Sequence, residues 1–188
     1  ASQAGAGRRF WAAVGIVGAA GVVLGVWGDI AALVLGVAVI GGGNVAVYLQ
    51  VSRGADVGRD HAFPGDHVQP TVFAMVTPIS EPHPDRRGIR AITRPDQRWG
   101  RCDIKSTALL ANVLARQAAQ EAGAGETILI RDGQLSEGSA SSVILVEAGA
   151  LVRRPAGPEV LPGTTTDAVF AVARQCGLDC RDEPVPEE

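Results

Sequence analysis

Polar and apolar residues are distributed differently before and after residue 47. Two long stretches, 10–28 and 30–52, hold no charged side chain, and their Ala, Val and Gly residues alternate without a clear period of 2 or 3.6. After Tyr48 the pattern becomes that of alternating strands and amphipathic helices. The sequence therefore predicts an atypical apolar segment, a small-domain remnant and a larger domain, over residues 1–46, 47–82 and 83–188.

The middle segment predicts two strands and a connecting loop. Val47–Val51 and Thr71–Val76 have the alternation of strands, and the glycine-containing run 53–58 predicts a loop that carries residues 59–61. Ile79–Asp85 contains two prolines, each of which fixes its own backbone and disfavours helix at the preceding residue. We therefore expect a linker there.

The last segment predicts strands with interposed helices, which is an α+β pattern. A helix is expected over Ser106–Ala122, with Ser106 as its N-cap and Gly123 as its stop. Asp132-Gly133 predicts a hairpin, and Ala148-Gly149 predicts a turn. Strands are predicted at Gly88–Thr93, Thr127–Ile130 and Ser142–Val146, and a second helix at Thr165–Gln175. On the first helix, Leu109, Leu110, Val113 and Leu114 share one face, while Arg116, Gln120 and Glu121 point toward water.

Composition narrows the classes of function. The net charge of -3 and the few aromatic residues provide neither a basic stripe nor a stacking platform, so nucleic-acid binding is not expected. Three cysteines, Cys102, Cys176 and Cys180, fit no metal-ligand spacing and are expected to be reduced thiols of a cytoplasmic protein. A membrane segment through residues 10–46 is the less favoured alternative, because glycine is dense there and Asp29 interrupts the apolar run.

Lys105 is the only lysine in a chain that contains sixteen arginines. A primary amine condenses with carbonyls, which a guanidinium does not do. Codon bias toward arginine would explain the scarcity of lysine but not its position.

Four motifs follow one another in the second half of the chain. They are RWGRCDIKS at 98–106, IRDG at 130–133, SEGSASS at 136–142 and LPGTT at 161–165. From about Tyr48 to the end, the chain resembles the D-amino acid aminotransferases, pyridoxal phosphate enzymes of fold-type IV. The resemblance implies a two-domain fold of which this chain holds a part, and a homodimer if that part folds.

The resemblance implies the catalytic role of Lys105. As the Schiff-base lysine it would bind pyridoxal 5'-phosphate and then move a proton between the substrate α-carbon and the cofactor. Because an amine does this only when partly neutral, a partly buried site is expected.

The resemblance also implies which residues hold the cofactor. Glu137, after a strand, would face the pyridine nitrogen and keep it protonated. Thr164 and Thr165, at a helix start, would bind the phosphate through backbone N–H groups. Leu161 would pack against the cofactor ring. Arg98 would contact the residues that bind the cofactor. Ser142 stands where the family usually has Asn, and Thr166 where it often has Arg.

The substrate site is implied by Arg59 and His61. The family's D-amino acid enzymes hold the substrate α-carboxylate with an Arg-x-His in this loop, and a planar guanidinium suits bidentate binding of a carboxylate. The preceding loop is one residue longer here. The expected reaction is transamination from a D-amino acid such as D-alanine to a 2-oxo acid such as 2-oxoglutarate.

Three alternatives stay open. Within fold-type IV, two of them are a branched-chain aminotransferase and an aminodeoxychorismate lyase. Outside catalysis, the alternative is an inactive remnant, with or without a membrane tether. Since the family's complete small domain and its C-terminal phosphate-binding loop are not recognisable, we expect a partial or frame-disrupted gene product.

Overall fold

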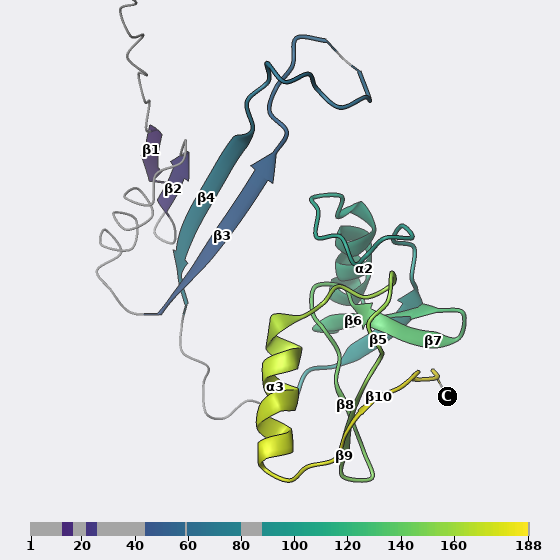
Figure 1. The fold of residues 1–188 in the computed structure, drawn as a ribbon. Coiled ribbons are helices and arrows are strands. Elements are labelled where there is room, and N and C mark those ends of the chain that lie inside the picture. Colours follow the sequence, from purple (N-terminus) through teal and green to yellow (C-terminus); the bar gives the residue numbers. More distant parts are fainter. Residues whose placement is uncertain (1–12, 17–21, 26–43, 59, 80–87, 188) are drawn as a thin grey trace, which may run out of the picture. The chain divides into compact units, whose positions relative to one another are not determined.

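The computed structural model describes residues 13–16, 22–25, 44–58, 60–79 and 88–187 (Figure 1). The chain divides into two compact units, Ala1–Arg86 and Arg87–Glu188. The domain boundary predicted between residues 82 and 83, most of the predicted linker and Arg59 lie outside the described residues. Each unit is therefore presented by itself.

The first unit is an antiparallel sheet of four strands in the order β1-β2-β4-β3. Both strands that the sequence predicted here are present, as β3 (Val45–Ser52) and β4 (Thr71–Pro78), and they pair along their whole length. The short strands β1 (Ala13–Ile16) and β2 (Val22–Gly25) extend the sheet beyond β4. Part of the apolar segment 1–46 thus forms strands. None of the helices in the described ranges is long and apolar enough to span a membrane.

The second unit contains two three-stranded sheets, each with one parallel pair of strands. In the first sheet, β5 (Ala91–Pro95) pairs parallel with β6 (Glu126–Arg131), which pairs antiparallel with β7 (Gln134–Gly138). Parallel neighbours need a crossover, and helix α2 (Leu110–Glu121) provides it. The mixture of sheets and helices confirms the predicted α+β class.

The second sheet repeats this arrangement. β8 (Leu145–Glu147) pairs antiparallel with β9 (Ala150–Arg153), and β9 pairs parallel with β10 (Cys180–Asp182) through helix α3 (Thr164–Gln175). Residues from both sheets form one apolar cluster. Its buried members are Leu135, Ala150, Val152 and Val185, with Ile128, Ile130 and Val143 packed against them.

The turns agree closely with the sequence. Asp132 and Gly133 both have positive φ, of 53° and 71°, which is the geometry of a tight hairpin between β6 and β7. Ala148 and Gly149 likewise have positive φ between β8 and β9. Gly123 ends α2 with φ of 65°, as predicted for a helix stop.

Several boundaries differ from the predicted ones. The strand expected at Gly88–Thr93 is Ala91–Pro95, and the strand expected at Ser142–Val146 is Leu145–Glu147. Helix α2 begins at Leu110 and has no side-chain cap, so the prediction of Ser106 as N-cap was wrong. The Ser106 hydroxyl instead accepts a long hydrogen bond from the Ala108 amide, at 3.4 Å. This local bond competes with the helix for the backbone.

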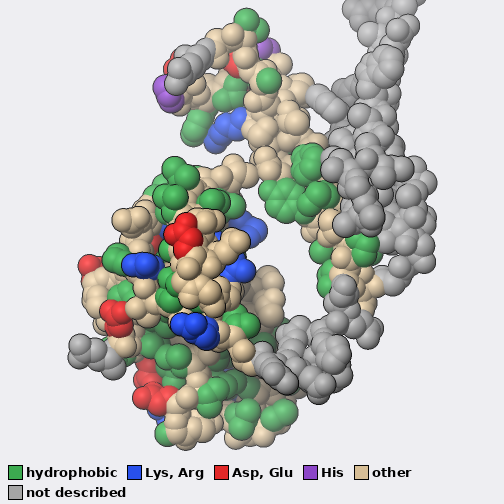
Figure 2. Space-filling model, turned by 180° about the vertical axis from the view of Figure 1, so that it is seen from behind, with side chains coloured by type: hydrophobic (Ala, Val, Ile, Leu, Met, Phe, Trp, Pro, Cys, Tyr) green, Lys and Arg blue, Asp and Glu red, His purple; other side chains and the backbone are tan. Residues whose placement is uncertain are grey.

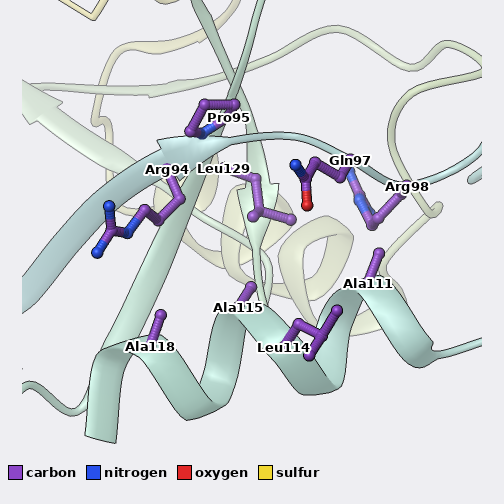
Figure 3. A pocket seen from close by; sticks show the side chains of 9 residues that line it. All are labelled: Arg94, Pro95, Gln97, Arg98, Ala111, Leu114, Ala115, Ala118 and Leu129. Carbon is purple, nitrogen blue, oxygen red and sulfur yellow. The ribbon is translucent and has the colours of Figure 1, made fainter. Parts of the chain in front are cut away.

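The buried face of α2 also differs from the predicted one. Leu110 and Val113 are 72% and 59% exposed, whereas Ala119 is fully buried. Figure 3 shows Ala111, Ala115 and Ala118 along α2 on the side of β5 and Leu129. Small side chains let a helix approach a sheet closely, so the alanine face packs. Within the described part of the chain, the leucine face remains exposed.

Thr127→Val is expected to lower the free energy of unfolding by about 1 kcal/mol, because it deletes a buried hydrogen bond while nearly preserving shape. Thr127 is fully buried in β6, and its hydroxyl donates to the Ala115 carbonyl of α2 at 2.7 Å. Urea unfolding of the full chain measures the loss. Thr93→Val, at an exposed position of β5, is the control. Equal losses in the two variants would contradict a specific role for this bond.

Candidate active site

Lys105 lies in the loop between β5 and α2. Its side chain is exposed, and it makes no hydrogen bond or ion pair with any residue that the structure describes. The loop itself is tied down just before it, because the amides of Cys102 and Asp103 donate to the Pro158 carbonyl at 2.7 and 3.3 Å. The backbone of the loop is therefore anchored, but the partly buried surroundings expected for Lys105 are not formed by the described residues.

A buried group of charges lies behind this loop. Arg98 donates from Nε and Nη2 to the two oxygens of Asp96, at 3.0 and 2.9 Å, and from Nη1 to Oε2 of Glu137. Arg131 contacts the same Asp96 at 3.1 Å. The side chains of Asp96, Arg98 and Glu137 are 0%, 8% and 9% exposed. We call Asp96, Arg98, Arg131 and Glu137 the buried charge cluster.

Hydrogen bonding decides the ionisation of Asp96 and Arg98. Burial alone would raise the pKa of Asp96, but the bonds that Arg98 and Ser136 donate to it outweigh burial and lower the pKa to about 2. Burial alone would lower the pKa of Arg98, but its bonds to Asp96 and Glu137 raise it further. Both groups are therefore charged at neutral pH.

Other charged side chains are interspersed over the exposed face seen in Figure 2, where ion pairs contribute little to stability.

Glu137 occupies strand β7 rather than the position after a strand that the sequence predicted. Arg98 binds its Oε2, whereas Oε1 has no hydrogen-bond partner among the described residues. No buried side-chain oxygen in that part of the chain lacks a partner. Oε1 is therefore accessible and free to accept a further hydrogen bond.

The loop after Glu137 is held by Glu126. Its carboxylate accepts hydrogen bonds from the hydroxyls of Ser139 and Ser141 and from the Ser139 amide. Burial alone would raise the pKa of Glu126, and these bonds lower it. Gly138 suits this tight loop, because an added Cβ would lie 2.3 Å from the Ser141 hydroxyl oxygen. The serine-rich motif thus fixes the end of the strand that carries Glu137.

Helix α3 begins at Thr164, one residue before the predicted start. Its N-cap is Gly163, no side chain caps it, and both Thr164 and Thr165 are exposed. The Thr166 hydroxyl donates backward to the Gly163 carbonyl at 2.7 Å. The backbone N–H groups of the first turn are therefore not used by a capping side chain.

The segment that precedes α3 connects these parts. Pro158 accepts the hydrogen bonds of the Lys105 loop, and the Glu159 carbonyl accepts one from Arg98 Nη2 at 2.9 Å. Half-buried Leu161 follows two residues later. A Cβ at Gly163 would lie 3.1 Å from the Ser142 hydroxyl oxygen, so the serine-rich motif also approaches the start of α3. Three motifs of the second unit meet around this segment.

The first unit carries the predicted substrate-binding pair. His61 is exposed in the loop between β3 and β4, where its amide donates to the Asp60 carboxylate at 2.6 Å. Arg59 lies outside the described residues. The prediction that the pair holds a carboxylate therefore stays a prediction.

Two pockets lie beside the cluster and border α2. One of about 250 Å³ separates α2 from β5 and has an apolar floor of Leu129 and the α2 alanines (Figure 3). The other, of about 350 Å³, is bordered by Trp99, Thr107 and Leu110. Arg98 is the predicted site residue that lines both. The first pocket lies between α2 and the strands, and the second lies between the loop after β5 and the start of α2.

The sequence did not single out Asp96, Arg131 or Ser136. Asp96 and Arg98 are two residues apart, and so are Arg101 and Asp103, which form a similar forked pair on the surface. Spacing does not distinguish a buried pair from an exposed one. The available signal was that Ser136 and Glu137 adjoin Arg131 in the same predicted hairpin.

Comparisons with known proteins identify the family. The sequence model of the class IV amino-transferases matches residues 30–188. D-alanine aminotransferase of Bacillus licheniformis is 40% identical over 143 residues, which cover 76% of this chain and 50% of the relative. The enzyme of Listeria monocytogenes serotype 1/2a (strain 10403S) is 39% identical over 140 residues, covering 72% and 48%. The chain thus spans about half the length of these relatives.

Solved structures agree with the sequence comparison. A hypothetical aminotransferase from Mycobacterium tuberculosis, in a form bound to α-ketoglutarate and PMP, matches 76% of this chain and 52% of its own with a TM-score of 0.63 at 28% identity. Branched-chain amino acid aminotransferase from Thermobaculum terrenum, in its PLP form, matches 84% and 53% with a TM-score of 0.71 at 21% identity, which supports the fold alone. The chain belongs to the class IV aminotransferase family.

Proposed function

We propose that this chain binds pyridoxal phosphate and contributes to transamination of D-amino acids, with a 2-oxo acid as acceptor. The main observation that supports this proposal concerns Glu137. Arg98 binds one oxygen of this buried carboxylate, and the other oxygen is available to accept a hydrogen bond. The motifs that precede Lys105 and α3 are hydrogen-bonded to the same region. The likeness to D-alanine aminotransferases supports the D-amino acid substrate.

These residues fit the cofactor by their chemistry. The available oxygen of Glu137 would accept a hydrogen bond from a protonated ring nitrogen. The uncapped N–H groups at Thr164 and Thr165 would bind a phosphate, which a helix N-terminus favours. Leu161 would supply apolar contact. Pyridoxal phosphate, when bound, supplies an electron-accepting ring that makes the substrate α-proton acidic.

Lys105 would be the group that moves the proton. Its Nζ would take the proton from the substrate α-carbon and pass it to the cofactor carbon that is joined to the substrate nitrogen, and in the second half of the reaction it would move a proton in the opposite direction. The anchored backbone at Cys102 and Asp103 fixes where this amine starts. Arg59 and His61 would hold the substrate α-carboxylate. The homodimer and the cytoplasmic location stay predictions.

Adding pyridoxal phosphate to the purified chain is expected to produce absorbance near about 410 to 420 nm, the band that this cofactor has when joined to a lysine amine. The measurement is a spectroscopic titration of the full chain at neutral pH. A titration without saturable absorbance would contradict cofactor binding and favour the inactive remnant.

Turnover with D-alanine and 2-oxoglutarate is expected to exceed turnover with L-alanine. The reason is that an Arg-x-His pair and the Lys105 amine would fix the carboxylate and the α-proton on defined sides of the ring. Pyruvate release, measured with each enantiomer, checks this. Preference for L-alanine would favour a branched-chain aminotransferase, and pyruvate from aminodeoxychorismate would favour the lyase.

A further inference from the structure

Asp96 has more partners than Glu137, the other carboxylate of the buried charge cluster. It accepts two parallel hydrogen bonds from Arg98, one at 2.8 Å from the Ser136 hydroxyl, and an ion pair from Arg131. Its side chain is fully buried. Asp96 therefore acts on its surroundings through Arg98.

The orientation of Arg98 follows from these contacts. A guanidinium is planar, so when Asp96 takes the Nε and Nη2 edge, the direction of Nη1 is determined. Nη1 is the atom that binds Oε2 of Glu137. The Glu159 carbonyl takes a further Nη2 hydrogen bond at 2.9 Å and restricts Arg98 from another side.

The charges of the cluster balance. Asp96 and Glu137 carry two negative charges, and Arg98 and Arg131 carry two positive charges. Arg98 binds both Asp96 and Glu137, so its positive charge is divided between two carboxylates. Without Asp96, Arg98 would interact with Glu137 more strongly and from a less defined direction. The carboxylate would then be a poorer acceptor at Oε1.

We propose that Asp96 is a positioning residue that, through Arg98, sets the direction and acceptor strength of Glu137 toward the cofactor's ring nitrogen. The inference rests on the proposed function, and it concerns one atom of the cofactor. A merely structural role for Asp96 would affect every cofactor contact alike. The two roles are therefore separable by changing that one ring atom.

The test compares two ligands of the full chain. One is pyridoxal phosphate, and the other is its analogue with a carbon in place of the ring nitrogen. Both carry the aldehyde and the phosphate, so only the contact with Glu137 differs. In the native chain pyridoxal phosphate is expected to bind about tenfold more tightly, the size typical of a charge-assisted hydrogen bond.

Asp96→Asn is expected to reduce this ratio of dissociation constants to near one, by weakening pyridoxal phosphate and not the analogue. Ser136→Ala removes the hydroxyl that contacts both Asp96 and the Leu129 carbonyl, and it is expected to reduce the ratio about twofold to threefold. It preserves the ion pairs, so it tests the inference where Asp96→Asn does not fold. Asp179→Asn breaks a surface pair with Arg181 at the same two-residue spacing and should leave the ratio unchanged.

The outcomes distinguish the two levels of the hypothesis. Equal weakening of both ligands by Asp96→Asn or Ser136→Ala, with the ratio preserved, would overturn the positioning role while the proposed function stands. If the native chain binds neither ligand, the proposed function is wrong, and the inference is wrong with it. A ratio that falls in the order native, Ser136→Ala, Asp96→Asn supports both.

Discussion

Lys105→Ala is expected to reduce transamination by roughly a hundredfold to ten-thousandfold, the contribution of a positioned proton-transfer group. The chain has no other lysine to take its place. The variant should also lose the absorbance near about 410 to 420 nm. Initial rates with D-alanine and the cofactor titration measure the two losses.

Reductive trapping identifies the amine that reacts. When borohydride is added in the presence of pyridoxal phosphate, the cofactor should be attached to the peptide that contains Lys105, as read by mass spectrometry. Apart from the α-amino group, no other amine is available. Lys105→Arg keeps the positive charge and should prevent labelling of that peptide.

Arg101→Lys provides a matched control on the same loop. Arg101 is more than half exposed, so the substitution places a second accessible amine four residues before Lys105. If the site directs the reaction, Lys105 alone should be labelled at low cofactor concentration. Equal labelling of both amines would show that Lys105 reacts only because it is exposed.

Asp96→Asn is expected to lower the free energy of unfolding by on the order of 3 kcal/mol at neutral pH, because it leaves buried guanidinium charge without its partner. Arg98 and Arg131 both depend on this carboxylate. Urea unfolding of the full chain, followed by circular dichroism, measures the loss. Asp103→Asn is the control, because it breaks a forked pair of like geometry with Arg101 on the surface. A loss as large in Asp103→Asn would contradict burial as the cause.

The difference in free energy of unfolding between the native chain and Asp96→Asn should decrease as the pH falls. The folded-state pKa of Asp96 is lowered from an ordinary 3.8 to about 2. A lowered acid pKa stabilises the folded state fully above the unfolded value and progressively less as pH falls through the folded value. This pKa shift corresponds to a contribution of about 2 kcal/mol to the free energy of unfolding. The gap between native chain and Asp96→Asn should therefore shrink from about pH 4 to pH 2, and a constant gap would contradict this assignment.

Helix α2 shows how far a periodic pattern predicts structure. The spacing of Leu110, Val113 and Leu114 correctly predicted a helix, and Gly123 correctly predicted its end. The pattern did not predict which face packs, because small alanines approach β5 and β6 more closely than leucines do (Figure 3). Burial depends on what lies opposite, which periodicity within one element does not contain.

The candidate site shows the same division. The order of the motifs predicted that Lys105, Glu137 and Thr164 belong to one family site, and short-range chemistry predicted the hairpin and the start of α3. The sequence did not reveal that Glu137 lies within β7, or that Arg98 joins it across 39 residues. Ion pairs between distant residues form only when strands bring them together, so no local spacing predicts them.

By itself, the sequence determined the α+β class of the second unit, its tight turns, and a single amine set among class IV motifs. Those features follow from backbone preferences and residue chemistry that act over a few positions. Only the tertiary structure decided which charges are buried. Asp96 and Asp103 have matching forked partners, yet packing removes one from water and leaves the other exposed. Burial is what makes Asp96 able to direct Arg98 toward Glu137.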